Sequence, residues 1–333
     1  MSGFNHLPSL TKKNRNRGRR STGGHTPNNH QFWDKRVNIQ LEDGSQIGGG
    51  NLISAIYRTD LVPVPVTLEL VVKADDRLRD LFTIGRKMTT PKGVPLVIVK
   101  SQVINEQSIK VGRRVAAIHV IAIIAGCEAL LGVTNKAVHL ENTNFNEVYR
   151  ALGAKVRIQR DVKLASFTCL KGQLPTAAIA LALQREAAVV CNTESGLSVI
   201  RLNELMGGNA LMFDKSAVQW IDNPNAVRHS NVNYLSIDDN GSDILGTARA
   251  ERSIQYYPRA DTRELQNLRR ILITKATITR QLDERLDAGA IISVDDQSLV
   301  TLTGVHKYET GAMGGQSVAA TKAWLAQVED TKQ

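Results

Sequence analysis

The chain has 333 residues, of which 42% are hydrophobic and 5% aromatic, and its formal net charge is +10. This length allows two or three domains with cores of their own, and the apolar fraction excludes a largely disordered protein. The positive charge is local, because residues 1–36 contain eight Lys or Arg and one acid, which leaves the rest of the chain with an ordinary charge balance.

Residues 1 to about 31 are rich in Asn, Arg, Gly, Ser and Thr and show no hydrophobic period, so they are predicted to form a flexible arm. No secretory signal is predicted there, and the longest apolar run, 115–125, is shorter than the ~20 residues that span a bilayer. The arm either contacts a polyanion or is a solvated tail that docks on a neighbouring subunit or keeps the protein soluble, and the second interpretation is favoured. The candidate partner or polyanion contacts are Lys12, Lys13, Arg15, Arg17, Arg19 and Arg20.

Alternating apolar residues predict a series of strands after the arm. They are expected at 37–41, 52–58, 62–72, 94–99 and, as one long strand or a hairpin, 109–124, with a charged loop at 75–92. Pro63 and Pro65 cannot donate to a ladder, so strand 62–72 is predicted to start at a sheet edge. Several long strands with few helices favour an antiparallel barrel or sandwich of about 100 residues. Within it, His119 is expected to be a half-buried strand residue with a hydrogen-bond partner.

The densest run of agreeing signals is 167–202. A turn precedes Pro175, which suits the first turn of a helix, and the helix is followed by a strand, a tight turn and a second strand. This helix is expected to lie across the hairpin and to bury Ile179, Leu181 and Leu183. Before this run, a short helix at 127–131, a helix at 145–152 capped near Asn144, and strands at 155–160 and 163–169 are predicted.

The last third of the chain is predicted to alternate strands and short helices. A strand is expected at 232–237, a surface Asx turn at 238–243, a helix at 262–268 capped by Asp261, a strand at 269–279 and a closing hairpin at 290–302. A flexible segment at 311–315 and a terminal helix at 318–328, containing Trp324, complete the chain.

No motif for catalysis, nucleotide binding or metal binding is found. Cys127, Cys169 and Cys191 lie far apart within apolar runs, which is typical of buried thiols in a reducing compartment. The acidic turn at 238–243 lacks the Gly and Glu positions of a calcium loop. The sequence therefore predicts no cofactor, no metal and no enzymatic activity.

Several parts of the sequence carry a resemblance to a known family. The run from Phe167 through Thr176 with its helix, then Glu186 to Cys191 and the Gly196-Leu197 hairpin, resembles the hub proteins of phage tail baseplates, which are related to the base of type VI secretion spikes. Segments 248–259, 270–274 and 302–306 are also similar to that group. The chain differs from contractile-tail hubs in being short and in carrying the basic arm.

The resemblance implies a β-dominated α+β fold in which tube-like antiparallel β-barrels carry small inserted α+β domains. The domains would be the arm (1–36), a first barrel (37–130), an α+β domain (131–245), a second barrel portion (246–310) and a C-terminal tail or helix (311–333).

The same resemblance implies a structural virion protein, made in the bacterial host cytoplasm, that forms a trimeric hub ring at the distal end of the tail tube. Its partners would be the distal tail or tail tube protein, spike or fiber proteins and the tape measure protein, and DNA would pass through the lumen during ejection without specific binding. Two alternatives stay open: a nucleic-acid-binding protein that uses the arm, and a hydrolase with an unrecognised site.

Overall fold

The computed structural model describes residues 39–47, 50–73, 76–104, 109–110, 113–114, 117–222, 232–246, 253–311 and 316–330. The predicted arm, with its six candidate contacts from Lys12 to Arg20, lies outside the described residues. So does most of the flexible segment predicted at 311–315. No described helix is long and apolar enough to cross a membrane.

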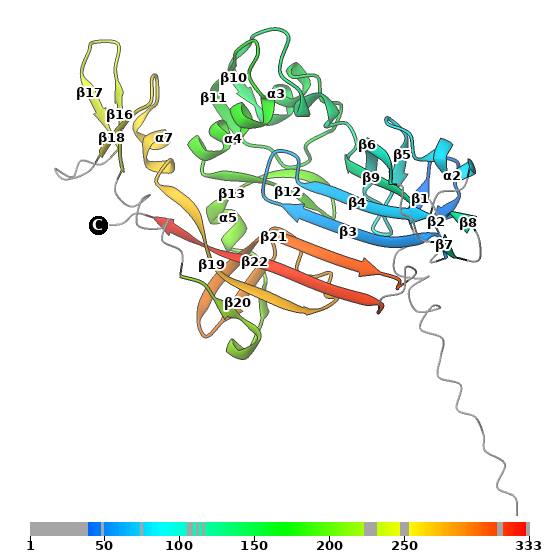
Figure 1. The fold of residues 1–333 in the computed structure, drawn as a ribbon. Helices are drawn as coiled ribbons and strands as arrows, with labels where there is room; N and C mark the ends of the chain where they lie inside the picture. Colours follow the sequence, from blue (N-terminus) through cyan, green and yellow to red (C-terminus); the bar gives the residue numbers. More distant parts are fainter. Residues whose placement is uncertain are drawn as a thin grey trace, which may run out of the picture.

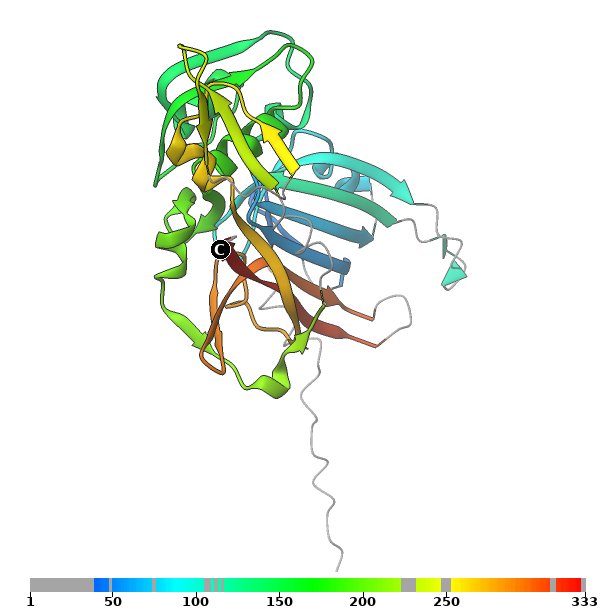
Figure 2. The ribbon, with the colours of Figure 1, turned by 90° about the vertical axis from the view of Figure 1, so that its left-hand side faces the viewer.

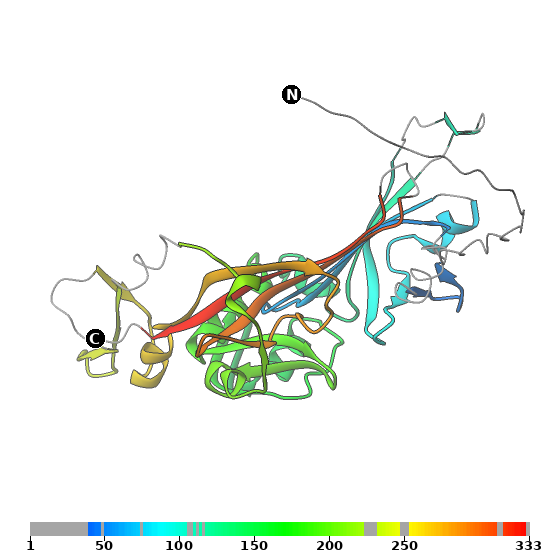
Figure 3. The ribbon, with the colours of Figure 1, turned by 90° about the horizontal axis from the view of Figure 1, so that it is seen from below.

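A 13-stranded sheet joins the first and last parts of the chain (Figures 1 and 3). Its strands are β1 (Ile39–Leu41), β2 (Gln46–Ile47), β3 (Leu52–Asp60), β4 (Val66–Lys73), β5 (Lys87–Thr89), β6 (Pro95–Ile104), β9 (Ala117–Ile124), β14 (Ala210–Met212), β15 (Gln219–Trp220), β19 (Arg270–Gln281), β20 (Ile291–Val294), β21 (Gln297–Glu309) and β22 (Val318–Asp330). The order is β15-β19-β22-β21-β3-β4-β9-β6-β5-β1-β2, with β20 beside β21 and β14 beside β20. The fold is therefore β-dominated, as predicted, and the strands expected in two separate barrel portions form one antiparallel sheet through the β3–β21 pair.

Buried and partly exposed residues alternate along β4, and this pattern explains how the sheet contributes to the core. Val66, Leu68, Leu70 and Val72 are buried, and the residues between them are partly exposed on the other face. The prediction that this strand starts at an edge was wrong, because β4 lies between β3 and β9. Its two prolines precede the strand in a turn, where a missing N–H breaks no ladder bond.

An α+β unit covers one face of the sheet. It contains η1 (Glu128–Leu131), β10 (Val138–Asn144), α3 (Phe145–Ala151), β11 (Lys163–Cys169), α4 (Pro175–Arg185), β12 (Ala188–Thr193), β13 (Gly196–Arg201) and α5 (Leu202–Met206). Buried residues of α3 and α4 share one core with the sheet, and the buried Tyr149 hydroxyl donates to the Pro63 carbonyl at 2.7 Å. This bond anchors α3 to the turn before β4.

The helix-and-hairpin run around α4 forms as predicted. The buried side chains of Ile179 and Leu183 point to the core, but Leu181 is 43% exposed, so its predicted burial was wrong. In an α-helix, residues two apart point about 200° away from each other, and Leu181 therefore faces away from Ile179 and Leu183. The cap of α3 is also confirmed, since the Asn144 side chain accepts from the Glu147 N–H at 3.0 Å.

Three other predictions were wrong for identifiable reasons. Residues 155–160 form a loop rather than a strand, and the partner of β11 is β10. The supposed loop at 75–92 contains α2 (Asp76–Leu81) and β5. The terminal helix is instead β22, a strand hydrogen-bonded to β19 on one side and β21 on the other. Its Ala-rich sequence has a local helical propensity that the two ladders override.

A smaller unit lies beyond α4 at one end of the molecule (Figures 1 and 2). It consists of β16 (Val232–Ile237), β17 (Asp243–Leu245), β18 (Ser253–Tyr256) and α7 (Thr262–Asn267). Asp261 and Glu264 form a capping box at the start of α7. The predicted Asx turn is present, with the Asp238 carboxylate accepting from the N–H groups of Asn240 and Ser242. The remaining elements are η2 (Lys215–Ala217) and a short hairpin of β7 (Ile109–Lys110) and β8 (Arg113–Arg114).

Candidate functional site: the groove beside His306

A groove of about 950 Å³ separates the main sheet from the α+β unit. One wall contains Tyr57 and Thr59 of β3 together with the loop 284–290 before β20, and the other contains the hairpin of β12 and β13. Residues 92–95, in the loop after β5 and at the start of β6, close a further side. Segments distant in sequence therefore present polar groups to one another across this groove.

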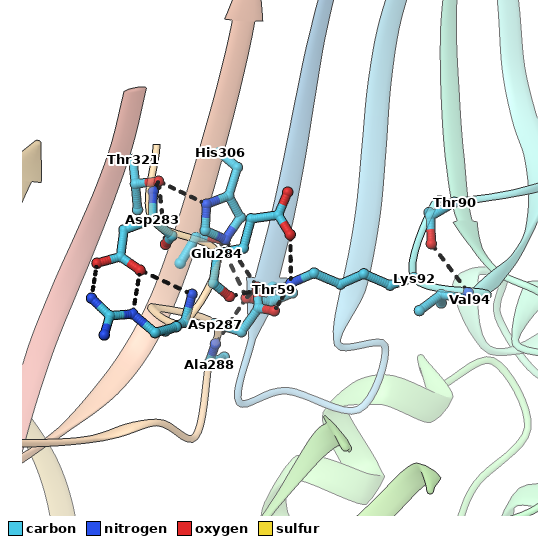
Figure 4. A network of polar contacts seen from close by, with 12 residues as sticks. Thr59, Thr90, Lys92, Val94, Asp283, Glu284, Asp287, Ala288, His306 and Thr321 are labelled. Carbon is cyan, nitrogen blue, oxygen red and sulfur yellow. Dashed lines mark hydrogen bonds and ion pairs between the residues drawn. The ribbon is translucent and has the colours of Figure 1, made fainter. Parts of the chain in front are cut away.

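His306 lies on β21 behind this wall, in contact with Asp287 of the groove lining (Figure 4). It is 1% exposed and stands between Tyr57 of β3 and Thr321 of β22 in the sheet register. Its ring stacks on Tyr57 with 6.2 Å between ring centroids. Its Nδ1 lies 2.9 Å from Thr321 Oγ1, and its Nε2 lies 3.0 Å from Asp287 Oδ1.

Asp287 connects this histidine to the loop after β5. Lys92 Nζ donates to Asp287 Oδ2 at 2.8 Å and to the Glu284 carbonyl at 3.2 Å. Thr59 Oγ1 lies 3.2 Å from Asp287 Oδ1 and accepts from the Ala288 N–H at 2.8 Å. Burial acts to raise the pKa of Asp287, but the hydrogen bond with His306 and the charge of Lys92 act against it, and the net direction is down.

The loop that carries Asp287 is tied to the sheet at a second point. The Asp283 N–H donates to Thr321 Oγ1 at 2.9 Å, so one hydroxyl contacts both the loop and His306. The Asp283 carboxylate accepts from Arg285 Nε and Nη2, each at 2.8 Å. Its pKa is lowered chiefly by these hydrogen bonds. The segment from Asp283 to Asp287 is consequently fixed at both of its ends, by Thr321 at Asp283 and by His306 and Lys92 at Asp287.

The hydroxyl, imidazole and carboxylate of Thr321, His306 and Asp287 have the composition of a nucleophilic triad but not its accessibility. An ionised carboxylate can only accept, so Nε2 of His306 donates to Asp287, and Nδ1 faces the Thr321 hydroxyl. A nucleophile must reach a substrate, whereas Thr321 is 0% exposed. The arrangement therefore acts as a structural joint between β21, β22 and the loop 284–290.

The opposite wall contains no activated nucleophile among the described residues. Burial raises the pKa of Cys191 to about 11, which keeps this thiol protonated, and Cys127, whose pKa burial raises to about 12, lies in the core rather than in the groove lining. In the hairpin turn, Thr193 Oγ1 lies 2.9 Å from Ser195 Oγ, and no base contacts this pair. No group of three or more potential metal ligands is found within the described ranges.

His119 was predicted correctly, and His306 was missed. The His119 ring is partly exposed on β9 and lies 2.7 Å from Glu69 Oε1 on β4. His306 contacts Thr321, Asp287 and Tyr57, which lie 15, 19 and 249 positions away from it in sequence. No local motif could indicate them, because they exist only once β3, β21 and β22 are paired.

No protein-family model and no curated protein matches the sequence. Solved structures do match over nearly the whole chain. A tail protein from Neisseria meningitidis MC58 has a TM-score of 0.59 and 11% identity, covering 88% of this chain and 96% of that one.

Two prophage proteins match about the same share of this chain. The 43 kDa tail protein of prophage MuSo2 from Shewanella oneidensis has a TM-score of 0.54 and 9% identity, covering 89% of this chain and 98% of that one. Prophage tail protein gp18 from Listeria monocytogenes EGD-e has a TM-score of 0.50 and 11% identity, with 87% and 94% covered. At these identities the likeness concerns architecture, and this chain has the fold of phage tail proteins.

Proposed function

We propose that this chain is a structural protein of a phage tail that forms the hub ring at the distal end of the tail tube. The observation that carries the proposal is the fold shared with three solved tail proteins along at least 94% of each of them. Because the matches also cover 87–89% of this chain, the likeness involves most of the architecture rather than one common domain.

The edges of the main sheet support assembly into a ring. Along β19, the short strand β15 pairs only with Ala276 and Thr277, and along β6, the strand β5 pairs only with residues 95–97. Ile98 of β6 also exchanges backbone hydrogen bonds with Gly85 and Arg86, and the rest of β6 has no ladder partner on that side among the described strands. An unpaired strand edge favours pairing with a neighbouring copy, and a closed ring would cover it.

The buried joint around His306 supports a mechanical rather than an enzymatic role. It ties β21 and β22 to the loop 284–290 and, through Lys92, to the loop after β5. Each tie fixes the spacing of strands that would form the wall of a tube. We therefore include in the proposal that the protein performs no reaction.

The finer parts of the proposal follow the family resemblance. The ring would be a trimer in which each chain supplies two tube-like portions, 37–130 and 246–310, with 131–245 inserted between them. It would connect the tail tube to spike or fiber proteins, contact the tape measure protein, and allow DNA to pass through its lumen. The basic arm, with Lys12, Lys13, Arg15, Arg17, Arg19 and Arg20, would dock on a neighbouring subunit.

The test is to locate the protein in particles. An epitope inserted after Ser2 should be labelled by a gold-conjugated antibody at the distal tip of purified tails, and particles produced without the chain should lack that tip. Purified virions that contain none of the protein, or label found on the capsid, would contradict the proposal.

The cluster of cations in the arm favours a second candidate, a protein that binds nucleic acid. Binding through phosphate contacts weakens steeply as salt is added. A gel shift that disappears both at high salt and on deletion of residues 1–31, together with absence from tails, would favour this candidate.

A further inference from the structure

Two loops of the α+β unit together present an exposed apolar surface. The Thr134 N–H donates to the Gln173 carbonyl at 2.9 Å, the Gly172 N–H donates to the Thr134 carbonyl at 2.8 Å, and Thr134 Oγ1 donates to the Leu170 carbonyl at 2.8 Å. These bonds hold the loops in one conformation, which lowers the entropy cost of binding. The loop platform consists of four exposed side chains: Leu131, Val133, Leu170 and Leu174.

The three-stranded sheet of the smaller unit presents a second such surface. One face of this sheet packs on α7 through Tyr234, Leu265 and Leu268. The register places Leu235 beside Leu245 and Tyr256, on the face that points away from α7. The outer sheet face consists of Leu235, Ile237, Leu245, Ile254 and Tyr256, and all but Leu235 are exposed. So many large apolar side chains on one exposed face indicate a binding surface.

The rims of the two surfaces carry opposite charges. Lys136 and Lys171 lie exposed on the loops of the platform, and neither 131–137 nor 170–174 contains an acid. The outer sheet face is bordered by Asp239 and Asp243, both exposed, in and after the turn that joins β16 to β17. Neither lysine forms an ion pair with any described residue. The surfaces are therefore complementary in both polarity and charge.

Helix α4 separates the two surfaces within one copy. Leu174 of the platform directly precedes α4, and at the other end Arg185 contacts Glu264 of α7 at 2.7 Å. An 11-residue helix is about 16 Å long, and α7 lies between its end and the outer sheet face. The two surfaces thus stand at opposite ends of α4 and cannot cover each other in the same chain.

We propose that the outer sheet face of one copy docks on the loop platform of a second copy of this chain. Contact between two different surfaces of identical chains is heterologous, and it closes into a ring when the rotation between copies permits. The inference rests on the proposed hub ring and specifies a contact within it, outside the edges of the main sheet.

The apolar part of the contact is tested with single substitutions in the full-length protein. Val133→Ser in the platform and Ile254→Ser in the outer sheet face should each weaken self-association about tenfold in sedimentation velocity. Ile84→Ser is the control, because Ile84 is equally exposed but belongs to neither surface, and it should leave association unchanged. Equal association of all three variants and the wild type would overturn the inference.

Charge reversal tests whether the two rims face each other. Asp239→Lys with Asp243→Lys should weaken association about tenfold, and so should Lys136→Asp with Lys171→Asp. A chain carrying all four reversals should recover it, because each rim again meets the opposite charge. Additive loss in the fourfold variant would show that the rims do not meet.

Mixing separates a heterologous contact from a symmetric one. A chain with the platform substitution still has an intact sheet face, and a chain with the sheet-face substitution still has an intact platform. At a concentration at which neither variant associates alone, equal mixtures should form mainly dimers. Mixtures that build full rings, or a wild type that stays monomeric at tens of micromolar, would overturn this contact, whereas the tail role itself depends on the gold-labelling result.

Discussion

Two buried polar clusters join distant parts of this chain, and they are built from different groups. Around His306, neighbouring strands of one sheet are joined mainly by an imidazole, threonine hydroxyls and one lysine (Figure 4). Around Glu186, at the end of α4, two separate units are joined by arginines.

The Glu186 cluster contains the stronger hydrogen bonds, because both partners are charged, and burying its charges costs more free energy of desolvation. The Glu186 carboxylate is 0% exposed, accepts from Arg263 at 2.6 and 2.8 Å and from Arg201 at 3.0 Å, and Arg185 pairs with Glu264 nearby. Within a sheet, the register already brings side chains close, so short hydroxyls suffice. Between units that share no ladder, long guanidinium groups reach across and bind in fixed geometry.

The largest effect is expected from displacing the helix that carries the second cluster. Leu183→Asp places an unpaired charge in the core beneath α4 and should lower the free energy of unfolding by about 4 kcal/mol. Leu181→Asp, on the exposed side of the same helix, should change it by less than about 1 kcal/mol. Urea titrations of both variants measure the difference, and similar losses for the two would mean that α4 packs differently.

Removing one arginine from the Glu186 cluster should have the next largest effect. Arg263→Ala leaves a fully buried carboxylate with only Arg201 as a cationic partner, and we expect a loss of about 3 kcal/mol. Arg160→Ala is the matched control, because Arg160 pairs with Glu204 at the exposed surface, where ion pairs contribute less than about 1 kcal/mol. If both arginines prove equally dispensable, the cluster does not join the two units.

The His306 cluster should be less sensitive, because its members retain other partners. In His306→Ala, Thr321 still binds the Asp283 N–H and Asp287 still binds Lys92, so the loss comes chiefly from the cavity beside Tyr57. We expect about 2 kcal/mol. His119→Ala removes a partly exposed histidine from the same sheet and should cost less than about 1 kcal/mol. Thermal unfolding with calorimetric enthalpies distinguishes these outcomes.

The sequence predicts a region well when the residues that interact there lie close together in the chain. The run 167–202 contains its own turn, helix start and hairpin, and the structure agrees with nearly all of it. The strand β22 was predicted as a helix because Ala319, Ala320 and Ala323 suit a helix locally, while its ladders involve residues far away in sequence.

The candidate site was less predictable than the fold for the same reason. Its polar wall depends on the pairing of β3 with β21, whose partners are separated by about 250 residues, such as Tyr57 and His306. Periodicity in one sequence shows which residues alternate, but not which strand lies beside which. Of the histidines that meet a carboxylate, His119 and His306 are therefore told apart only by their neighbours in space.

The smallest expected effect is the acid sensitivity that the titration of Asp287 gives to the His306 cluster. Its pKa is lower in the folded protein than the ordinary value near 3.9, so the unfolded chain binds this proton first as pH falls. The stability that the carboxylate contributes is therefore complete above about pH 4 and is lost as pH falls through the folded pKa. Asp287→Asn removes this contribution, so its unfolding free energy should fall less steeply between pH 5 and 3 than that of the wild type. Urea titrations across that range provide the measurement, with Asp239→Asn as the matched removal of an exposed carboxylate. Identical slopes for all three proteins would mean that Lys92 and His306 do not stabilise the ionised form of Asp287.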